Sequence, residues 1–329
     1  MEMVKLLVGA GATFNQPGQS RKTILELCAS ESTLTGPRSR MFRFLLEKGA
    51  DINNRWATPG DRRENSALTC IIENLGDDEL AQLALDAGAL VNDWGRSSWG
   101  GLTPIQAAAG RGHIRLVRML LERGADINAP AAFKYGRTAL QAACSRVEPD
   151  MDLIKLLIDQ GADVNAKAGQ RYGLTALQGA AIQGHIKLVL FLIDLGADVN
   201  APPAHKHGRT ALDGAAENGR LDMVQVLLNA GAKCSVGGRS GYDSAVEFAQ
   251  GEGHWAVAEL LADSKPSASS ASLIEPDESE FILDTSVMGQ LEGAEDSCGF
   301  TAGVEVPWLD QTEALEPPVL LREDLFDNW

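Results

Sequence analysis

Hydrophobic and polar positions alternate in a pattern that returns every 34 to 37 residues between residues 66 and 244. The clearest unit is residues 103–128, where apolar residues recur at helical spacing in two short stretches. The first stretch contains Ile105, Ala108 and Ala109, and the second contains Ile114, Val117, Leu120 and Leu121. Each unit is therefore predicted to form two short helices, and the small alanines allow a neighbouring helix to approach closely.

The ends of these two helices carry local signals. Thr103 is a good N-cap, and Pro104 follows at the first helical position, where its missing N–H costs nothing. Gly110 and Gly112 are expected to break the first helix, so that the second begins near residue 113. Gly124 is expected to end the second helix, because glycine adopts positive φ easily. Helices this short do not persist alone in water, so each unit must be stabilised by its neighbours.

A nine-residue phrase, a helix end running into Gly-Ala-Asp-hydrophobic-Asn, closes most units. It stands at 120–128, 157–165 and 192–200, with near copies at 6–15, 45–53, 83–92 and 227–235. The units start at Thr23, Ser66, Thr103, Thr138, Thr175, Thr210 and Ser244. The step from Thr23 to Ser66 is longest, which predicts an insertion, most simply at 30–40, with a longer turn at 55–64. A fixed period of this size is typical of a solenoid, whose primary role is to present a binding surface.

The unit TPIQAAAGRGHIRLVRMLLERGADIN, repeated in register, resembles the ankyrin repeat over about residues 4–262. The resemblance implies an all-α ankyrin solenoid of helix-turn-helix repeats with hairpin fingers, which binds proteins through its fingers and concave helices. In style, the extended fingers are similar to the large ankyrin families of filamentous fungi. The histidine of the family's Thr-Pro-Leu-His phrase is replaced in this chain, so its hydrogen bonds cannot simply be carried over. The replacing residues are Glu26, Thr69, Gln106, Gln141, Gln178, Asp213 and Glu247.

Three segments are expected. Residues 1–15 form a partial N-terminal repeat that opens in a second helix, which indicates either a short cap or a longer parent protein. Residues 16–263 form an array of about seven repeats, and the last unit, 244–264, lacks the exit phrase and suits a C-terminal cap. Residues 264–329 are predicted to be a disordered acidic tail, because acids and apolar residues mix there without sustained periodicity.

Charge is distributed unequally between the array and the tail. The chain has 45 acidic and 29 basic residues, and fifteen of the acids but only two of the bases lie in 264–329. The array is nearly neutral, which argues against nucleic acid as a partner, because phosphate binding needs a basic field. Five cysteines without paired spacing favour a reducing compartment. No apolar run is long enough for a spanning helix and no secretory signal is present, so we expect a cytoplasmic or nuclear protein without membrane contact.

Candidate binding residues lie in three fingers in which the exit asparagine and the next threonine are ten positions apart. A cation stands four positions before each threonine, and a tyrosine or histidine stands three positions before it. Because equivalent positions stack along a solenoid, a cationic row (Lys134, Arg171, Lys206) is expected beside an aromatic row (Tyr135, Tyr172, His207), extended by Trp99, Phe133 and His205. The hypothesis is a docking strip for an acidic or aromatic-bearing segment of a protein partner. In the alternative, the rings pack on the next finger and the cations are solvated.

Several functions remain open at this level. The expected one is a non-catalytic scaffold or adaptor that binds protein partners. The alternatives are a sensor fragment of a larger signalling protein and a transcriptional co-regulator with the tail as its activation segment. The tail itself has three candidate uses: to solubilise the array, to fold back on the cationic fingers as an autoinhibitor, or to dock on another protein.

Catalytic chemistry has little support in the sequence. No glycine-rich phosphate loop is present, and the cysteines are scattered over different repeats. His113, His185 and His254 share one position at the start of the second helix, where capping or packing is the simpler interpretation. His205 and His207 flank Lys206 in a finger and make a weak zinc pair. The prediction is therefore no enzyme, no cofactor and no metal.

Overall fold

The computed structural model describes residues 10–11, 15, 25, 28, 38–54, 66–94, 101–233 and 241–264. Its helices are short and alternate with turns and loops. In chain order they are α3 (Arg38–Glu47), α4 (Ala67–Asn74), α5 (Asp78–Asp86), α6 (Pro104–Arg111), α7 (Ile114–Glu122), α8 (Ala139–Cys144), α9 (Met151–Asp159), α10 (Ala176–Gln183), α11 (Ile186–Asp194), α12 (Ala211–Glu217), α13 (Leu221–Asn229), α14 (Gly241–Gly251) and α15 (Trp255–Asp263).

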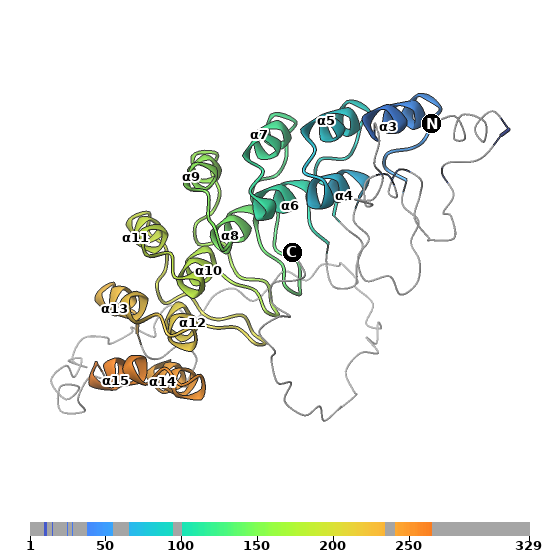
Figure 1. Ribbon diagram of the computed structural model, residues 1–329. Helices are drawn as coiled ribbons and strands as arrows, with labels where there is room; N and C mark the ends of the chain where they lie inside the picture. Colours follow the sequence, from blue (N-terminus) through green and yellow to red (C-terminus); the bar gives the residue numbers. More distant parts are fainter. Residues whose placement is uncertain are drawn as a thin grey trace, which may run out of the picture. The chain divides into compact units, whose positions relative to one another are not determined.

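The helices stand in two rows, with odd-numbered helices in the outer row and even-numbered helices in the inner row (Figure 1). Each inner helix from α4 to α12 packs against the next inner helix, and each from α4 to α14 packs against the outer helix that follows it in the chain. The all-α architecture of stacked helix pairs predicted from the sequence period is thus confirmed. In the described part of the chain, no helix is both long enough and apolar enough to cross a membrane.

The core runs continuously through the stack and follows the predicted apolar spacing. Each of the inner helices α6, α8, α10 and α12 buries a pair of small side chains, such as Ala108 and Ala109 in α6. The outer helix of the same pair buries three larger ones, which in α7 are Leu116, Val117 and Leu120. The small residues of the inner row allow neighbouring inner helices to approach closely. The larger residues of the outer row fill the space between the two rows.

Local signals set most helix ends. Thr103, Thr138, Thr175 and Thr210 each form a capping box, in which the hydroxyl accepts from the backbone N–H three residues later. Gly112 ends α6 with φ of 78°, as expected of a left-handed C-cap. The prediction that Gly110 breaks α6 is wrong, since this residue is helical. A single glycine inside a helix lowers helix stability by only about 1 kcal/mol relative to alanine. α6 therefore continues through Gly110 and ends at Gly112, the C-cap.

The last helix pair starts earlier than the sequence suggested. α14 begins at Gly241, so Ser244 lies inside the helix instead of preceding it. The Ser244 hydroxyl donates to Oδ1 of Asp213 in the previous repeat, 2.8 Å away. Asp243 falls in the first turn of α14, where a negative charge interacts favourably with the helix dipole. Ser244 thus contacts the previous repeat from inside the helix.

Some predicted segments lie wholly or largely outside the described residues. They include most of 1–37, the turn at 55–64, and all of the acidic tail from residue 265 onward. Within the predicted insertion at 30–40, α3 already begins at Arg38.

Candidate functional site

In each of three inner helices, a buried glutamine is hydrogen-bonded to the loop that leaves the same repeat. Its Oε1 accepts the backbone N–H of the capping threonine, and its Nε2 donates to two carbonyl oxygens of the loop at 2.7 to 3.2 Å. These bonds join Gln106 to Ala129 and Pro130, Gln141 to Ala166 and Lys167, and Gln178 to Ala201 and Pro202. The glutamines that depart from the family phrase thus form a hydrogen-bond network of their own.

The exit asparagines set the spacing between repeats. Each Nδ2 donates to a glycine carbonyl in the next repeat, and each Oδ1 accepts a backbone N–H two residues after that glycine. For Asn128 the partners are the carbonyl oxygen of Gly161 and the N–H of Asp163, both at 2.9 Å. The same pair of bonds is made by Asn53, Asn92, Asn165 and Asn200. This ladder holds successive loops in a constant register.

We define the fingers as residues 129–137, 166–174 and 201–209, which follow three of these exits. They leave the inner helices side by side (Figure 1), and parallel bridges pair Lys134 with Arg171 and Arg171 with Lys206. The N–H of Tyr135 donates to the carbonyl oxygen of Arg171 at 2.9 Å, and the N–H of Tyr172 donates to that of Lys206 at 3.0 Å. The three predicted cations are therefore held on neighbouring, hydrogen-bonded backbones.

The three predicted rings form a continuous stack. The centroids of Tyr135 and Tyr172 are 4.5 Å apart, as are those of Tyr172 and His207, with interplanar angles of 13° and 4°. All three residues have positive φ, between 54° and 58°, which residues other than glycine rarely adopt. Such a backbone costs about 1 to 2 kcal/mol per residue, and each ring pair returns about 0.5 to 1.5 kcal/mol. The rings pack on the next finger, as the alternative to the docking strip expected, and Tyr135 and His207 remain exposed.

The glycine after each ring is required by the tight finger backbone. A Cβ on Gly136 would lie 2.1 Å from backbone atoms of Ala132, and one on Gly173 would lie 2.3 Å from those of Gly169. Gly208 is in the same position relative to Ala204. The two arms of each finger therefore touch through their main chains, which makes the loop narrow and places the ring at its tip.

The cations lie beside these rings. Lys134 Nζ is 5.0 Å from the ring centroid of Tyr135, and Arg171 Cζ is 5.8 Å from that of Tyr172. Among the described residues, no carboxylate forms an ion pair with Arg171 or Lys206. The three fingers contain six basic residues and no acidic one. One of the six, Arg209, is neutralised by Glu217 through a bond of 2.8 Å.

Phe133 and His205 flank the two rows and are exposed, as is Gln170 at the equivalent position of the middle finger. Gln170 was not among the predicted binding residues, because its side chain is neither charged nor aromatic. Its position, five residues before the capping threonine, is the same as that of Phe133 and His205. Trp99 lies outside the described residues, so its predicted place beside the rows is not described.

The histidines at the start of the outer helices pack against the preceding repeat. His113, His185 and His254 occupy the N-cap position but make no side-chain capping bond. Nε2 of His185 lies 2.9 Å from the carbonyl oxygen of Arg146, and the ring of His113 covers Gly76. Burial lowers the pKa of His113. Across the described ranges, no three His, Cys, Asp or Glu side chains are grouped to hold a metal ion.

Stacked helix pairs joined by bridged fingers define a solenoid of short helical repeats. A family model described as ankyrin repeats, in three copies, matches residues 68–168 and 148–237, which together span more than half of the chain. The chain therefore belongs to the ankyrin repeat family, whose members typically mediate protein–protein interactions and are generally non-catalytic. A comparison with curated proteins found no match.

Proposed function

We propose that this chain is a non-catalytic scaffold or adaptor, and that an acidic, aromatic-bearing segment of its protein partner docks on the fingers and the adjoining concave helices. The observation that carries the proposal is the pair of rows on the fingers, cations beside stacked rings, without a single acidic residue in the three loops.

The charge of the fingers supports an acidic partner. Bridged neighbours in a sheet lie about 5 Å apart, and like charges at such positions destabilise the pairing. Lys134, Arg171 and Lys206 are bridged in this way. Carboxylates of a bound segment would offset this repulsion and would gain charge-assisted hydrogen bonds from the same three side chains.

The rings support a partner that also has aromatic or flat side chains. Tyr135 is 46% exposed and Phe133 is 53% exposed, although both are large and apolar. Aromatic residues beside cations are enriched among the residues that contribute most to binding free energy. Because the stacking and the bridges already hold the rings in place, binding would cost little side-chain entropy.

The test is affinity capture from native lysate with the full chain and with the triple variant Lys134→Glu, Arg171→Glu, Lys206→Glu. The matched control is Arg118→Glu, Lys155→Glu, Lys187→Glu, which makes the same change in net charge at exposed positions of the outer helices. We expect a stoichiometric partner that is retained by the control and weakened about tenfold or more by the finger variant. Equal capture by all three proteins would exclude the fingers as the docking site.

The chain's own acidic tail is a second candidate occupant, because residues 264–329 contain fifteen acids and two bases. Adding this segment as a separate peptide, at low and at high salt, distinguishes a tail that occupies the fingers from a tail that does not. An autoinhibitory tail would compete with the partner at low salt and stop competing at high salt, whereas a solubilising or docking tail would not compete at either.

A further inference from the structure

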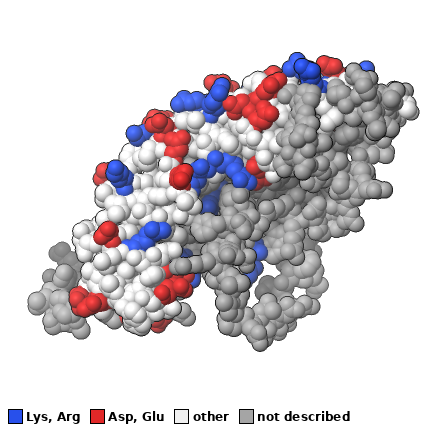
Figure 2. Space-filling model, viewed as in Figure 1, with Lys and Arg blue, Asp and Glu red and all other residues white. Residues whose placement is uncertain are grey.

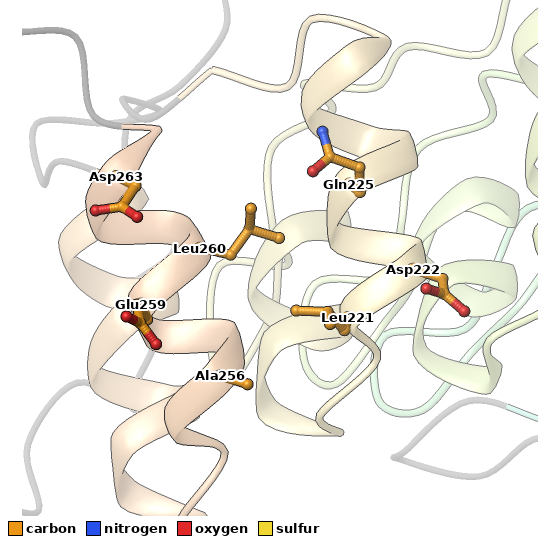
Figure 3. A pocket seen from close by; sticks show the side chains of 7 residues that line it. All are labelled: Leu221, Asp222, Gln225, Ala256, Glu259, Leu260 and Asp263. Atoms are coloured by element: carbon orange, nitrogen blue, oxygen red, sulfur yellow. The ribbon is translucent and has the colours of Figure 1, made fainter.

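A shallow groove of about 370 Å³ lies between the outer helices α13 and α15 and is lined by side chains of these two helices (Figure 3). Leu221 and Leu260 reach toward each other from the two helices and, with Ala256, supply its apolar part. Asp222 and Gln225 line it from α13, and the Asp222 carboxylate points away from α15 in this view, so it stands at the edge of the groove. Glu259 and Asp263 follow one another along α15. The groove thus combines an apolar floor with three carboxylates and no basic residue.

This charge is particular to the last groove. The helices α7, α9, α11, α13 and α15 are all nine residues long, so their positions correspond one to one. The positions equivalent to the groove lining contain two lysines and two aspartates between α9 and α11, and one lysine and one aspartate between α11 and α13. Between α7 and α9 they contain three bases and two acids. Among these four pairs of outer helices, the positions between α13 and α15 alone are purely acidic.

The surroundings extend the acidic surface. Residues 241–264 contain five acids and no lysine or arginine. Figure 2 shows acidic side chains at the end where α14 and α15 lie, whereas basic and acidic side chains alternate over the outer helices farther along the row. Trp255, next to Ala256 at the start of α15, is 68% exposed, the highest value among the exposed large apolar residues of the described ranges.

We infer that this groove binds a basic segment of a partner protein, with an apolar side chain against Leu221 and Leu260 and lysines or arginines on Asp222, Glu259 and Asp263. Trp255 offers a face for a further cation. Charge argues against the chain's own acidic segment 265–329 as the occupant, because this segment carries fifteen acids and two bases. This site lies on the outer helices, so the inference is independent of the function proposed for the fingers.

The probe is a pair of synthetic peptides of about fifteen residues that share a leucine and alanine stripe and carry either lysine or glutamate at the other positions. Each has a fluorophore and a photoreactive group, and binding to the full chain is followed by anisotropy. We expect the lysine peptide to bind and the glutamate peptide not to bind. The cross-link, mapped by mass spectrometry, is expected on α13 or α15.

The groove variant is Asp222→Lys with Asp263→Lys, and its matched control is Asp152→Lys with Asp194→Lys. All four residues are exposed, and the two control residues occupy the same helical positions on α9 and α11. We expect the groove variant to lose about tenfold in affinity and the control to lose little, because net charge changes equally in both. Trp255→Ala is expected to weaken binding to a smaller degree.

Four results would overturn the inference, and the first three concern the peptide experiments. They are equal losses in the groove variant and its control, cross-links confined to the acidic segment 265–329, and no binding of the lysine peptide. A fourth is concentration-dependent self-association in sedimentation that the groove variant abolishes, because the occupant would then be a second copy of this chain. The variant Lys134→Glu, Arg171→Glu, Lys206→Glu is expected to bind the lysine peptide unchanged, which separates this site from the fingers.

Discussion

Nε2 of Gln141 donates a hydrogen bond to the carbonyl oxygen of Ala166 at 2.7 Å, across 25 residues of sequence. The same side chain accepts the N–H of Thr138 at 3.0 Å, so one residue caps α8 and holds the base of the middle finger. Glutamine thereby connects helix and loop at the position where the family phrase has histidine.

Replacing this glutamine tests that role. Gln141→Leu replaces the amide by an apolar side chain of similar size, and it leaves the N–H of Thr138 and the carbonyl oxygens of Ala166 and Lys167 without their partner. We expect a loss of about 2 to 4 kcal/mol in the free energy of unfolding, because buried unsatisfied polar groups are costly. Urea denaturation followed by circular dichroism measures it. A loss below about 0.5 kcal/mol, the low end for one net hydrogen bond, would contradict the role.

The asparagine ladder makes a second prediction. Asn128→Ala removes both bonds to the next exit, to Gly161 and Asp163, and should cost about 1 to 2 kcal/mol, since the site is exposed and water replaces part of the loss. Asn128→Asp keeps the acceptor for Asp163 but not the donor for Gly161, so its stability should fall between the wild type and Asn128→Ala. If Asn128→Asp is the less stable of the two, the acceptor bond is not the main contribution.

The stacked rings predict an unusual order of stability at residue 172. Tyr172→Gly and Tyr172→Ala lose the same two ring contacts, but glycine relieves the left-handed backbone strain that alanine retains. Tyr172→Gly should therefore be more stable than Tyr172→Ala by about 1 kcal/mol, the reverse of their order in a helix. Thermal and urea unfolding of the two variants decide this. An alanine variant as stable as the glycine variant would mean that the backbone at 172 relaxes once the ring is gone.

The fold should protect the thiol of Cys144 from alkylation. Its side chain is fully buried in α8, and burial raises the pKa of its thiol to about 12. Since the thiolate is the reactive form, alkylation at pH 8 should require unfolding of this part of the array. Iodoacetamide labelling in a urea series, read by peptide mass spectrometry, should place the onset of Cys144 labelling at the unfolding transition. Rapid labelling in native buffer would show that α8 opens locally.

His113 predicts a dependence of stability on pH. Burial lowers its pKa in the folded chain, although Asp78 acts in the opposite direction, so the unfolded chain binds the proton more tightly. The full contribution of His113 to the free energy of unfolding is therefore made above the ordinary histidine pKa of about 6.5. This contribution is lost as pH falls through and below that value. The melting temperature of the wild type should therefore drop more between pH 7.5 and pH 5.5 than that of His113→Gln. Equal drops would assign the dependence to other groups.

Much of the fold could be predicted because its signals are local. Thr103 and Pro104 act within one helical turn, and Gly112 and Gly124 end helices through their own backbone freedom, with φ of 78° and 82°. The apolar spacing of each unit likewise specifies its own buried face. Ser244, which the sequence placed at the start of its unit, lies inside α14, and its hydroxyl is bonded to Asp213 of another repeat.

The sequence by itself determined the repeat, the helix pairs and the positions at which the cations and rings of the fingers fall in register. Only the tertiary structure decided that Tyr135, Tyr172 and His207 stack on a left-handed backbone, and that Gln141 bonds the finger. It also placed Leu221 and Leu260 on facing sides of one groove, which acidic residues of α13 and α15 line as well. The physical reason is that these arrangements bring together residues 25 to 39 positions apart, so their geometry depends on how one repeat packs on the next.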